Sequence, residues 1–406
     1  MVQYHQTCNS SNNLLSHHGS FGQEEPTSLQ TQPSLRSIPS LTSELQLQQH
    51  QFPTAHHQCI ATLTGQSSYT SSLFLAGKFL LTGSSDKEIR LWRRNDLKPL
   101  NKKLTGNVVT AGQGAVKSLV VSADKLFSAH QDHKIRVWKI DSDKAEKKKL
   151  THLATLPKLS DRVLNCLNPK NHVQVRRHKK CIWVQHVDTV SALALSTDES
   201  HLYSVSWDRT LKIWRTTDFK CLESVANAHD DAINAVALST HGHVYTGSAD
   251  KKIKVWRKGL GQKKHSLVAT LERHKSGVNA LALSADGSVL YSGACDRSVL
   301  VWEKDDGSWM LAVGALKGHT KSILCLAVVS NLVCSGSADK TVRIWTGVER
   351  SYSCLAVLEG HTGPVKCLTM AKDHSNTSDA ASSFLLYSSS LDCDTKIWQI
   401  LTVYSV

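Results

Sequence analysis

The chain of 406 residues has few of the features that would place it in a membrane or outside the cell. Its eleven cysteines are odd in number and include no C-x-x-C pair, which argues against a disulfide framework and a zinc site. No run approaches the roughly 18 apolar residues that a membrane helix needs. Residues Met1 to His5 have no basic-then-apolar layout, so no signal peptide is expected. We therefore expect a protein of the cytoplasm, the nucleus or both, with no membrane partner.

Constellations that would support catalysis are also lacking. No Ser/His/Asp set, paired carboxylate or Cys/His pair stands apart from the repeats described below. Residues 112–118 faintly resemble a phosphate loop, but no Gly precedes Lys117, and the segment aligns with the strand-like residues 365–368. Five histidines recur about 40 residues apart, whereas metal-binding histidines usually cluster. The sequence therefore predicts no enzyme activity, no metal and no cofactor.

What the chain does contain is an Asp placed six residues before a Trp, seven times. Successive tryptophans of these pairs lie about 42 to 53 residues apart, except for one longer step after Trp138. A fixed motif repeated at about 40 residues is typical of a propeller, in which each repeat forms one four-stranded blade. The pairs are Asp86/Trp92, Asp132/Trp138, Asp208/Trp214, Asp250/Trp256, Asp296/Trp302, Asp339/Trp345 and Asp392/Trp398.

The repeats divide the chain into a tail and one folded domain. Residues 1–56 are rich in Ser, Gln and His, so they are predicted to be a disordered tail. Short β-branched runs and Gly or Asp turns fill residues 57–402, which predicts an all-β, seven-bladed β-propeller that is monomeric. We name the four strands of each blade a to d. Cys59–Leu63 looks like the outer strand d of later repeats, and it is predicted to complete the last blade and close the ring.

The repeats resemble the WD40-repeat family, and the resemblance covers about 85% of the chain. It implies a buried tetrad of His, Ser or Thr, Asp and Trp in each repeat, and such a polar chain is stable only if every member is satisfied. Two repeats keep Thr82 and Ser128 but lack the His before strand a, so their blades are expected to be tied less tightly. No strand-c Trp is followed by Asp. The complete sets are His186, Ser204, Asp208 and Trp214; His229, Thr246, Asp250 and Trp256; His274, Ser292, Asp296 and Trp302; His319, Ser335, Asp339 and Trp345; and His361, Ser388, Asp392 and Trp398.

Residues 139–182, between blades 2 and 3, form the longest connection. They hold 12 Lys and Arg against 4 acidic residues, which is over half of the chain's net charge of +14. Ser160–Leu167 has an N-cap and apolar residues at helical spacing before Asn168-Pro169, which predicts a short helix. Residues 151–157 and 180–186 both suit the outer strand of blade 2.

The basic clusters of this insertion have three interpretations. They could form a solvated loop or partner contact, a nuclear-import signal, or a nucleic-acid site. Nucleic acid is disfavoured because no aromatic platform interleaves the charges. The insertion resembles the plant Jingubang-like branch of WD40 proteins, which implies a regulatory adaptor in plant growth or development. The clusters comprise Lys147, Lys148, Lys149, Arg176, Arg177, Lys179 and Lys180.

The turns between strands b and c offer a second basic surface. Propeller geometry would gather these turns on one face, where cations could steer acidic or phosphorylated protein segments, although basic residues are also ordinary in solvated turns. Trp207 precedes Asp208 in one such turn and would either anchor a partner or fold back onto its own blade. The residue after the repeat Asp is cationic at Lys87, Arg209, Lys251, Arg297 and Lys340.

These observations predict a non-enzymatic protein-interaction scaffold or adaptor that binds other proteins through the face carrying the b–c turns. One alternative is a substrate receptor of a cullin–RING ubiquitin ligase, but such propellers typically show Trp-Asp-x-Arg after strand c, which is absent here. Another is a nucleic-acid-associated protein that acts through the basic insertion.

Overall fold

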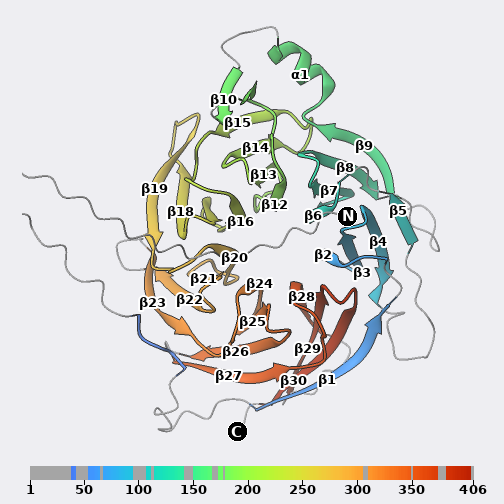
Figure 1. Ribbon diagram of the computed structural model, residues 1–406, viewed down its shortest axis with the longest axis vertical. Coiled ribbons are helices and arrows are strands. Elements are labelled where there is room, and N and C mark those ends of the chain that lie inside the picture. Colours follow the sequence, from blue (N-terminus) through green and yellow to red (C-terminus); the bar gives the residue numbers. More distant parts are fainter. Residues whose placement is uncertain are drawn as a thin grey trace, which may run out of the picture. The chain divides into compact units, whose positions relative to one another are not determined.

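The structure is a computed structural model, and its described residues are 38–42, 54–64, 67–94, 107–110, 114–140, 150–166, 172–176, 179–304, 310–348, 351–373 and 381–403. They form seven four-stranded antiparallel sheets arranged around a centre, which confirms the predicted seven-bladed β-propeller (Figure 1). Of the predicted tail, residues 1–56, the structure describes only residues 38–42 and residues 54–56, which begin strand β1.

Each blade takes its strands in chain order, with strand a nearest the centre (Figure 1). The first three blades are β2 (Thr70–Ala76), β3 (Phe79–Ser84), β4 (Glu88–Arg93) and β5 (Asn107–Thr110); β6 (Val116–Ser122), β7 (Lys125–His130), β8 (Ile135–Ile140) and β9 (Leu150–Leu156); and β12 (Val190–Leu195), β13 (His201–Ser206), β14 (Leu211–Arg215) and β15 (Cys221–Val225).

The next three blades repeat this order. They are β16 (Ile233–Leu238), β17 (His243–Ser248), β18 (Lys252–Lys258) and β19 (His265–Glu272); β20 (Val278–Leu283), β21 (Val289–Ala294), β22 (Val299–Lys304) and β23 (Met310–Leu316); and β24 (Ile323–Val329), β25 (Leu332–Ser337), β26 (Val342–Val348) and β27 (Ser351–Leu358).

Blade 7 joins the two ends of the propeller. Its strands a to c are β28 (Val365–Lys372), β29 (Ala381–Ser390) and β30 (Thr395–Val403), and its outer strand is β1 (Thr54–Leu63). β1 pairs antiparallel with β30 along its whole length, from Thr54 opposite Val403 to Leu63 opposite Thr395. The prediction that Cys59–Leu63 closes the ring is therefore confirmed. Closure in this way pairs the edge of β30 that would otherwise be open.

Apolar side chains fill the spaces between neighbouring blades. One buried cluster joins Trp398 and Phe384 of blade 7 to Ile344 of blade 6, and another joins Trp214 of blade 3 to Phe127 of blade 2. Middle strands b and c are buried on both faces, because a neighbouring blade covers each side. The strand-c tryptophans therefore serve as core residues as well as hydrogen-bond donors.

A side chain near the start of every strand a hydrogen-bonds the neighbouring blade. Ser, Asn or Cys makes the contact, and all seven junctions have one. They are Ser71 with Val116 O, Ser118 Oγ with Leu193 N, Ser191 with Ile233 O, Asn234 with Val278 O, Asn279 with Ile323 O, Cys325 with Val365 O and Cys367 with Thr70 O. Blade 7 is thus joined to blade 1 in the same manner as the other neighbours.

The insertion folds as three short elements beside blades 2 and 3. Helix α1 (Leu159–Cys166) confirms the helix predicted at Ser160–Leu167. β10 (His172–Arg176) and β11 (Lys179–Ile182) form a separate two-stranded sheet. Of the two segments that suited the outer strand of blade 2, the first takes that place, because β9 pairs with β8.

Ile38–Thr42 lies along the outer strand of blade 5. Leu41 N donates to Ala315 O, and Ala315 N donates to Pro39 O, each at 3.0 Å, which makes a parallel bridge to β23. The Leu41 side chain packs where Gly314 has none, since a Cβ on that glycine would lie 2.4 Å from Leu41 Cγ. We call Ile38–Thr42 the strap. It lies within the segment that the sequence predicts to be tail.

Candidate functional site

The structure brings together the four residues of all five complete tetrads. In each, His Nε2 lies 2.7–2.8 Å from the Ser or Thr hydroxyl, and His Nδ1 lies 2.8–3.2 Å from the Asp carboxylate. The Trp indole donates to the same hydroxyl at 2.8–2.9 Å. A histidine with its proton on Nδ1 satisfies every partner: it donates to Asp, and the hydroxyl donates to Nε2. These buried networks position the b–c turns.

The tetrad keeps its Asp ionised. Burial alone would favour the neutral acid of Asp250, but bonds from His229 and two backbone N–H groups outweigh it and lower its pKa to about 2. Burial lowers the pKa of His319, against the opposing influence of Asp339. Each tetrad therefore carries a fixed carboxylate next to a desolvated imidazole, and both serve the fold.

Blade 2 has a histidine that the repeat pattern misses. His130 stands on strand b, two residues after Ser128, and its Nε2 lies 2.8 Å from Ser128 Oγ. Its Nδ1 donates to Gly114 O at 3.0 Å, while Trp138 donates to Ser128 at 2.8 Å. Blade 2 does lack the histidine before strand a, as the sequence indicates, but its imidazole comes from within the sheet, which the repeat pattern did not predict. The pattern Ser-x-His on one strand is the signal, since residues i and i+2 share a strand face.

The Asp of blade 2 is also bound differently. Asp132 pairs with the two terminal guanidinium nitrogens of Arg136, Nη1 at 3.1 Å and Nη2 at 2.5 Å. In blade 1, Trp92 donates to Thr82 at 3.1 Å, and Asp86 accepts bonds from Ser67 and Ser84. Ser67 thus approaches Asp86 from the incoming loop, where blades 3 to 7 place histidine.

The b–c turns and the connections between blades lie on the same face, because the strands of each blade alternate in direction. We call it the turn face, and the opposite face carries the a–b and c–d connections. The residue after each repeat Asp has a left-handed backbone, with φ between 67° and 77°. Lys87, Lys251, Arg297 and Lys340 are exposed there, and Arg209 is half-buried. The structure thus gathers all five predicted cations on one face.

Trp207 bridges two blades on the turn face. It is half-buried, and the Lys117 ammonium of β6 lies 5.9 Å from its ring centroid. Its backbone N–H donates to Thr189 O at 3.0 Å. Burial lowers the pKa of Lys117, and repulsion from Lys366 adds to this effect. The indole therefore neither stands free nor folds wholly into its own blade, and it forms a cation–π contact across the junction.

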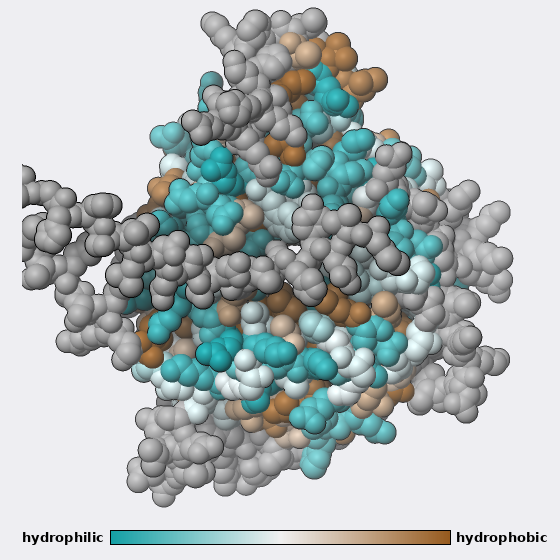
Figure 2. Space-filling view, viewed as in Figure 1, coloured by the Kyte–Doolittle hydropathy of each residue, from teal (hydrophilic) through white to brown (hydrophobic). Residues whose placement is uncertain are grey.

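The insertion presents an apolar surface. Leu159 and Val163 of α1 are 73% and 53% exposed, and Leu153 of β9 is 45% exposed. Hydrophobic residues appear beside α1 at the top of the space-filling view (Figure 2). Of the predicted basic residues, Arg176 ends β10, and Lys179 and Lys180 begin β11. Lys147, Lys148, Lys149 and Arg177 lie outside the described residues.

Neither a metal cluster nor a membrane helix is found in the part of the chain that the structure describes. No group of three or more His, Cys, Asp or Glu could hold an ion there. No helix among those residues is long and apolar enough to cross a bilayer.

The model of the WD domain, G-beta repeat, matches six segments of the chain, and together they cover more than half of it. The segments are residues 57–93, 179–215, 219–257, 265–303, 310–346 and 352–399. The chain belongs to the WD40-repeat family. Five of the six segments run from the outer strand of one blade to strand c of the next, as in β15 to β18, so this repeat straddles a junction. The sixth begins at β11, the second strand of the insertion hairpin.

Blade 2 falls outside the six segments. It is also the blade in which His130 replaces the loop histidine and Arg136 holds the Asp. The Trp-to-hydroxyl bond is kept there. Local replacement of two tetrad contacts is consistent with the missing match.

Relatives share parts of the propeller. The chain is similar to Zinc finger CCCH domain-containing protein 62 of Arabidopsis thaliana, with 29% identity over 39% of the chain and 37% of that protein. It is 31% identical to Pre-mRNA-processing factor 19 of Oryza sativa subsp. japonica over 24% of the chain and 18% of that protein. It is 29% identical to Mitochondrial division protein 1 of Schizosaccharomyces pombe over 27% of the chain and 19% of that protein. The chain thus spans well under two thirds of these relatives.

Proposed function

We propose that this WD40 protein is a non-enzymatic scaffold that binds acidic or phosphorylated protein segments on its turn face. The observation that carries the proposal is the contact between Trp207 and Lys117 at a blade junction, with Arg209 two residues along the turn. A half-buried aromatic ring held in place by a neighbouring blade is preorganised for contact, since little rotamer freedom remains to be lost on binding.

Charge supports this choice of partner. The cations Lys87, Lys251, Arg297 and Lys340 surround the same face and are exposed. Their positions are fixed by left-handed turns rather than by flexible loops. A ring of fixed cations raises the local concentration of anionic ligands and accelerates their association. Charge-assisted bonds to carboxylate or phosphate would then hold the segment.

The regulatory setting is part of the same proposal. The insertion's resemblance to the Jingubang-like branch supports a role in plant signalling or developmental regulation, in the cytoplasm or nucleus. The exposed Leu159 and Val163 of α1 give the insertion an apolar contact surface of its own. The scaffold would then have two contact regions, the turn face for the anionic segment and the insertion for a second contact.

A quantitative affinity capture from native cells tests the proposal. Wild type is compared with Trp207→Ala, with the charge-reversed variant Arg209→Glu/Lys251→Glu/Arg297→Glu, and with a deletion of residues 159–178, which leaves β9 in blade 2. Loss of the same partners in the first two variants, with retention in the deletion, supports turn-face binding. Retention of every partner after charge reversal contradicts it. Nucleic acid lost only on deletion, with steep salt dependence between about 50 and 200 mM, would favour the alternative function.

A further inference from the structure

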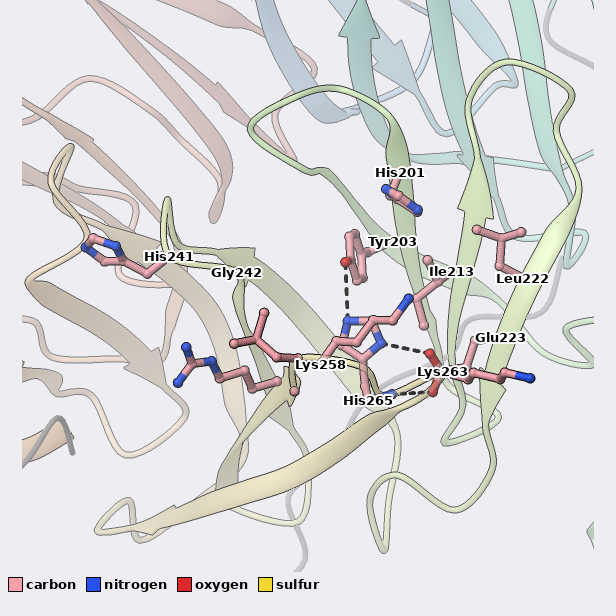
Figure 3. A pocket seen from close by; sticks show the side chains of 13 residues that line it. His201, Tyr203, Ile213, Leu222, Glu223, His241, Gly242, Lys258, Lys263 and His265 are labelled. Carbon is pink, nitrogen blue, oxygen red and sulfur yellow. Dashed lines mark hydrogen bonds and ion pairs between the residues drawn. The ribbon is translucent and has the colours of Figure 1, made fainter.

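A second basic site lies on the opposite face, between blades 3 and 4. A cavity of about 510 Å³ opens there, lined by residues of β13 and β15 and by the connections on either side of β17 and β18 (Figure 3). Those connections, residues 239–242 and 259–264, are the a–b and c–d connections of blade 4. The cavity is therefore separate from the turn face and does not depend on the function proposed for it.

The cavity has a built polar floor. Glu223 Oε2 accepts from His265 Nδ1 and Oε1 accepts from the His265 backbone N–H, both at 2.8 Å. His265 Nε2 lies 3.3 Å from the Tyr203 hydroxyl (Figure 3). The Glu223 and His265 side chains are 7% and 6% exposed. Both oxygens of the Glu223 carboxylate accept a bond from His265, which fixes this side chain within the floor.

The rim is cationic and uncompensated. Arg257, Lys258 and Lys263 line the cavity, are exposed, and form no ion pair with any residue that the structure describes. They stand against one lining carboxylate, Glu223. His201 and His241 add ring nitrogens to the wall. Three unpaired cations beside a hollow leave a positive potential that an anion would satisfy.

Burial and the nearby cations lower the pKa of two histidines at or near the cavity, His201 and His243. Burial lowers the pKa of His201, and Lys258, His265 and Arg215 lower it further, while Asp198 opposes them. Burial likewise lowers the pKa of His243, helped by Arg257, Lys304 and His241. Positive groups from both blades therefore repel further protonation, which leaves neutral imidazoles as donors alongside permanent cations.

We propose that this cavity binds a phosphate group carried on a side chain of a protein partner. Arg257 offers a planar fork that matches two phosphate oxygens, while Lys258 and Lys263 act as point charges. Leu222 is 37% exposed and Leu260 fully exposed at the rim, so they give a flanking peptide an apolar contact that a free ion would not use. A membrane is the weaker occupant, because Leu260 is the one apolar residue of the connection 259–264, and stable anchoring takes more than one such signal.

The test uses the full-length protein and a degenerate peptide library immobilised with phosphoserine or phosphothreonine, or with neither. The pocket variant is Arg257→Gln/Lys258→Gln/Lys263→Gln. Its matched control, Lys78→Gln/Lys139→Gln/Lys372→Gln, removes equal charge from exposed positions on the same face, in the a–b turn of blade 1 and near the strand ends of blades 2 and 7. Wild type and control should retain phosphorylated peptides equally. The pocket variant should lose affinity about tenfold or more.

Four outcomes would overturn the proposal. Equal losses in the two triple variants would mean a general charge effect. Equal retention of phosphorylated and unphosphorylated peptides would show that phosphate is not read. Inorganic phosphate binding as tightly as the peptides, or binding seen only with phosphatidylcholine vesicles doped with phosphatidylinositol phosphate, would mean a free phosphate or a lipid ligand.

A second measurement guards against misfolding of the pocket variant. A photoreactive phosphopeptide cross-linked to wild type should map to residues 257–265, and inorganic phosphate in excess should suppress the cross-link. Cross-links confined to the turn face would contradict the cavity site while leaving the function proposed for that face intact.

Discussion

His130 Nε2 lies 2.8 Å from Ser128 Oγ on the same strand, so the imidazole of blade 2 reaches the tetrad hydroxyl from within the sheet. The other tetrad histidines come from the loop before strand a. His130 is fully buried and also holds the Gly114 carbonyl. It ties strand b to the incoming chain, as the loop histidines do in five other blades.

His130→Ala should therefore destabilise the propeller by roughly 1–3 kcal/mol, because Ser128 and Gly114 each lose a buried partner. His133→Ala is the matched control, since His133 is exposed in the adjacent turn. Thermal unfolding midpoints measure the effect. A shift of similar size in both variants would mean that His130 has no special role.

Asp132→Ala should cost about as much as Asp250→Ala, roughly 1–3 kcal/mol each. The sequence predicts a smaller effect at Asp132 because its repeat lacks the loop histidine. The structure gives a reason to expect otherwise: Arg136 is 8% exposed and loses its carboxylate partner. Adding Arg136→Met to Asp132→Ala should recover part of the loss, since an unpaired buried charge is removed. Denaturant unfolding of both single variants and the double variant measures this, and no recovery would contradict the account.

Stability should fall as the pH is lowered from 6.5 toward 4, partly because of His130. Burial, opposed by the bond to Gly114, lowers its pKa from 6.5 to about 4. In this window the unfolded chain binds a proton that the folded chain does not, so stability rises with pH, by up to about 1.4 kcal/mol per unit for one group. Unfolding at several pH values measures the slope. His130→Leu should be shallower than wild type, and an unchanged slope would refute the assignment.

Leu41→Ala in the strap should lower the unfolding midpoint, because Leu41 packs against the buried core between blades 5 and 6. The loss should be about 1–3 kcal/mol, below that of a central core leucine. Gly314→Ala alone should also destabilise, since its Cβ would overlap Leu41. If the strap contact is real, the double variant should lose less than the two single losses combined. Strict additivity would argue against the contact.

Lys251→Gly should stabilise the fold by about 0.5–1 kcal/mol while removing one turn-face cation, because Lys251 has a φ of 73°. Lys252→Gly, one residue on within β18, is the control and should destabilise. Paired stability and partner-capture measurements separate the backbone effect from charge. Destabilisation by Lys251→Gly would contradict the relief of backbone strain.

The sequence predicts the blades well because the Asp of each pair marks a b–c turn and the Trp marks the strand c that follows it. It also predicts β1 in blade 7, since Cys59–Leu63 has the pattern of an outer strand. It misses His130 because the family pattern looks for histidine in the loop. The strap is invisible for a different reason: five residues in a polar segment acquire a place only when Gly314 leaves room for Leu41.

The candidate sites likewise divide into residues that a local pattern predicts and contacts that form only when distant parts of the chain meet. Turn-face cations can be read from position alone, since each follows a repeat Asp. The cation–π contact of Trp207 with Lys117 depends on how two blades meet, as does the cavity between Tyr203 and Arg257. Residues far apart in the chain build both, so no local pattern reports them.

The pairing of β1 with β30 has a consequence for biosynthesis. Leu63 leaves the ribosome long before its partner Thr395. At about 5–20 residues per second, the interval is on the order of tens of seconds. During that time the strands of blades 1 to 6 emerge one after another, while β1 has no sheet to join. Until β30 is made, the nascent propeller is an open ring and β1 is an unpaired strand. A chaperone that shields residues 54–63 would matter most in that interval.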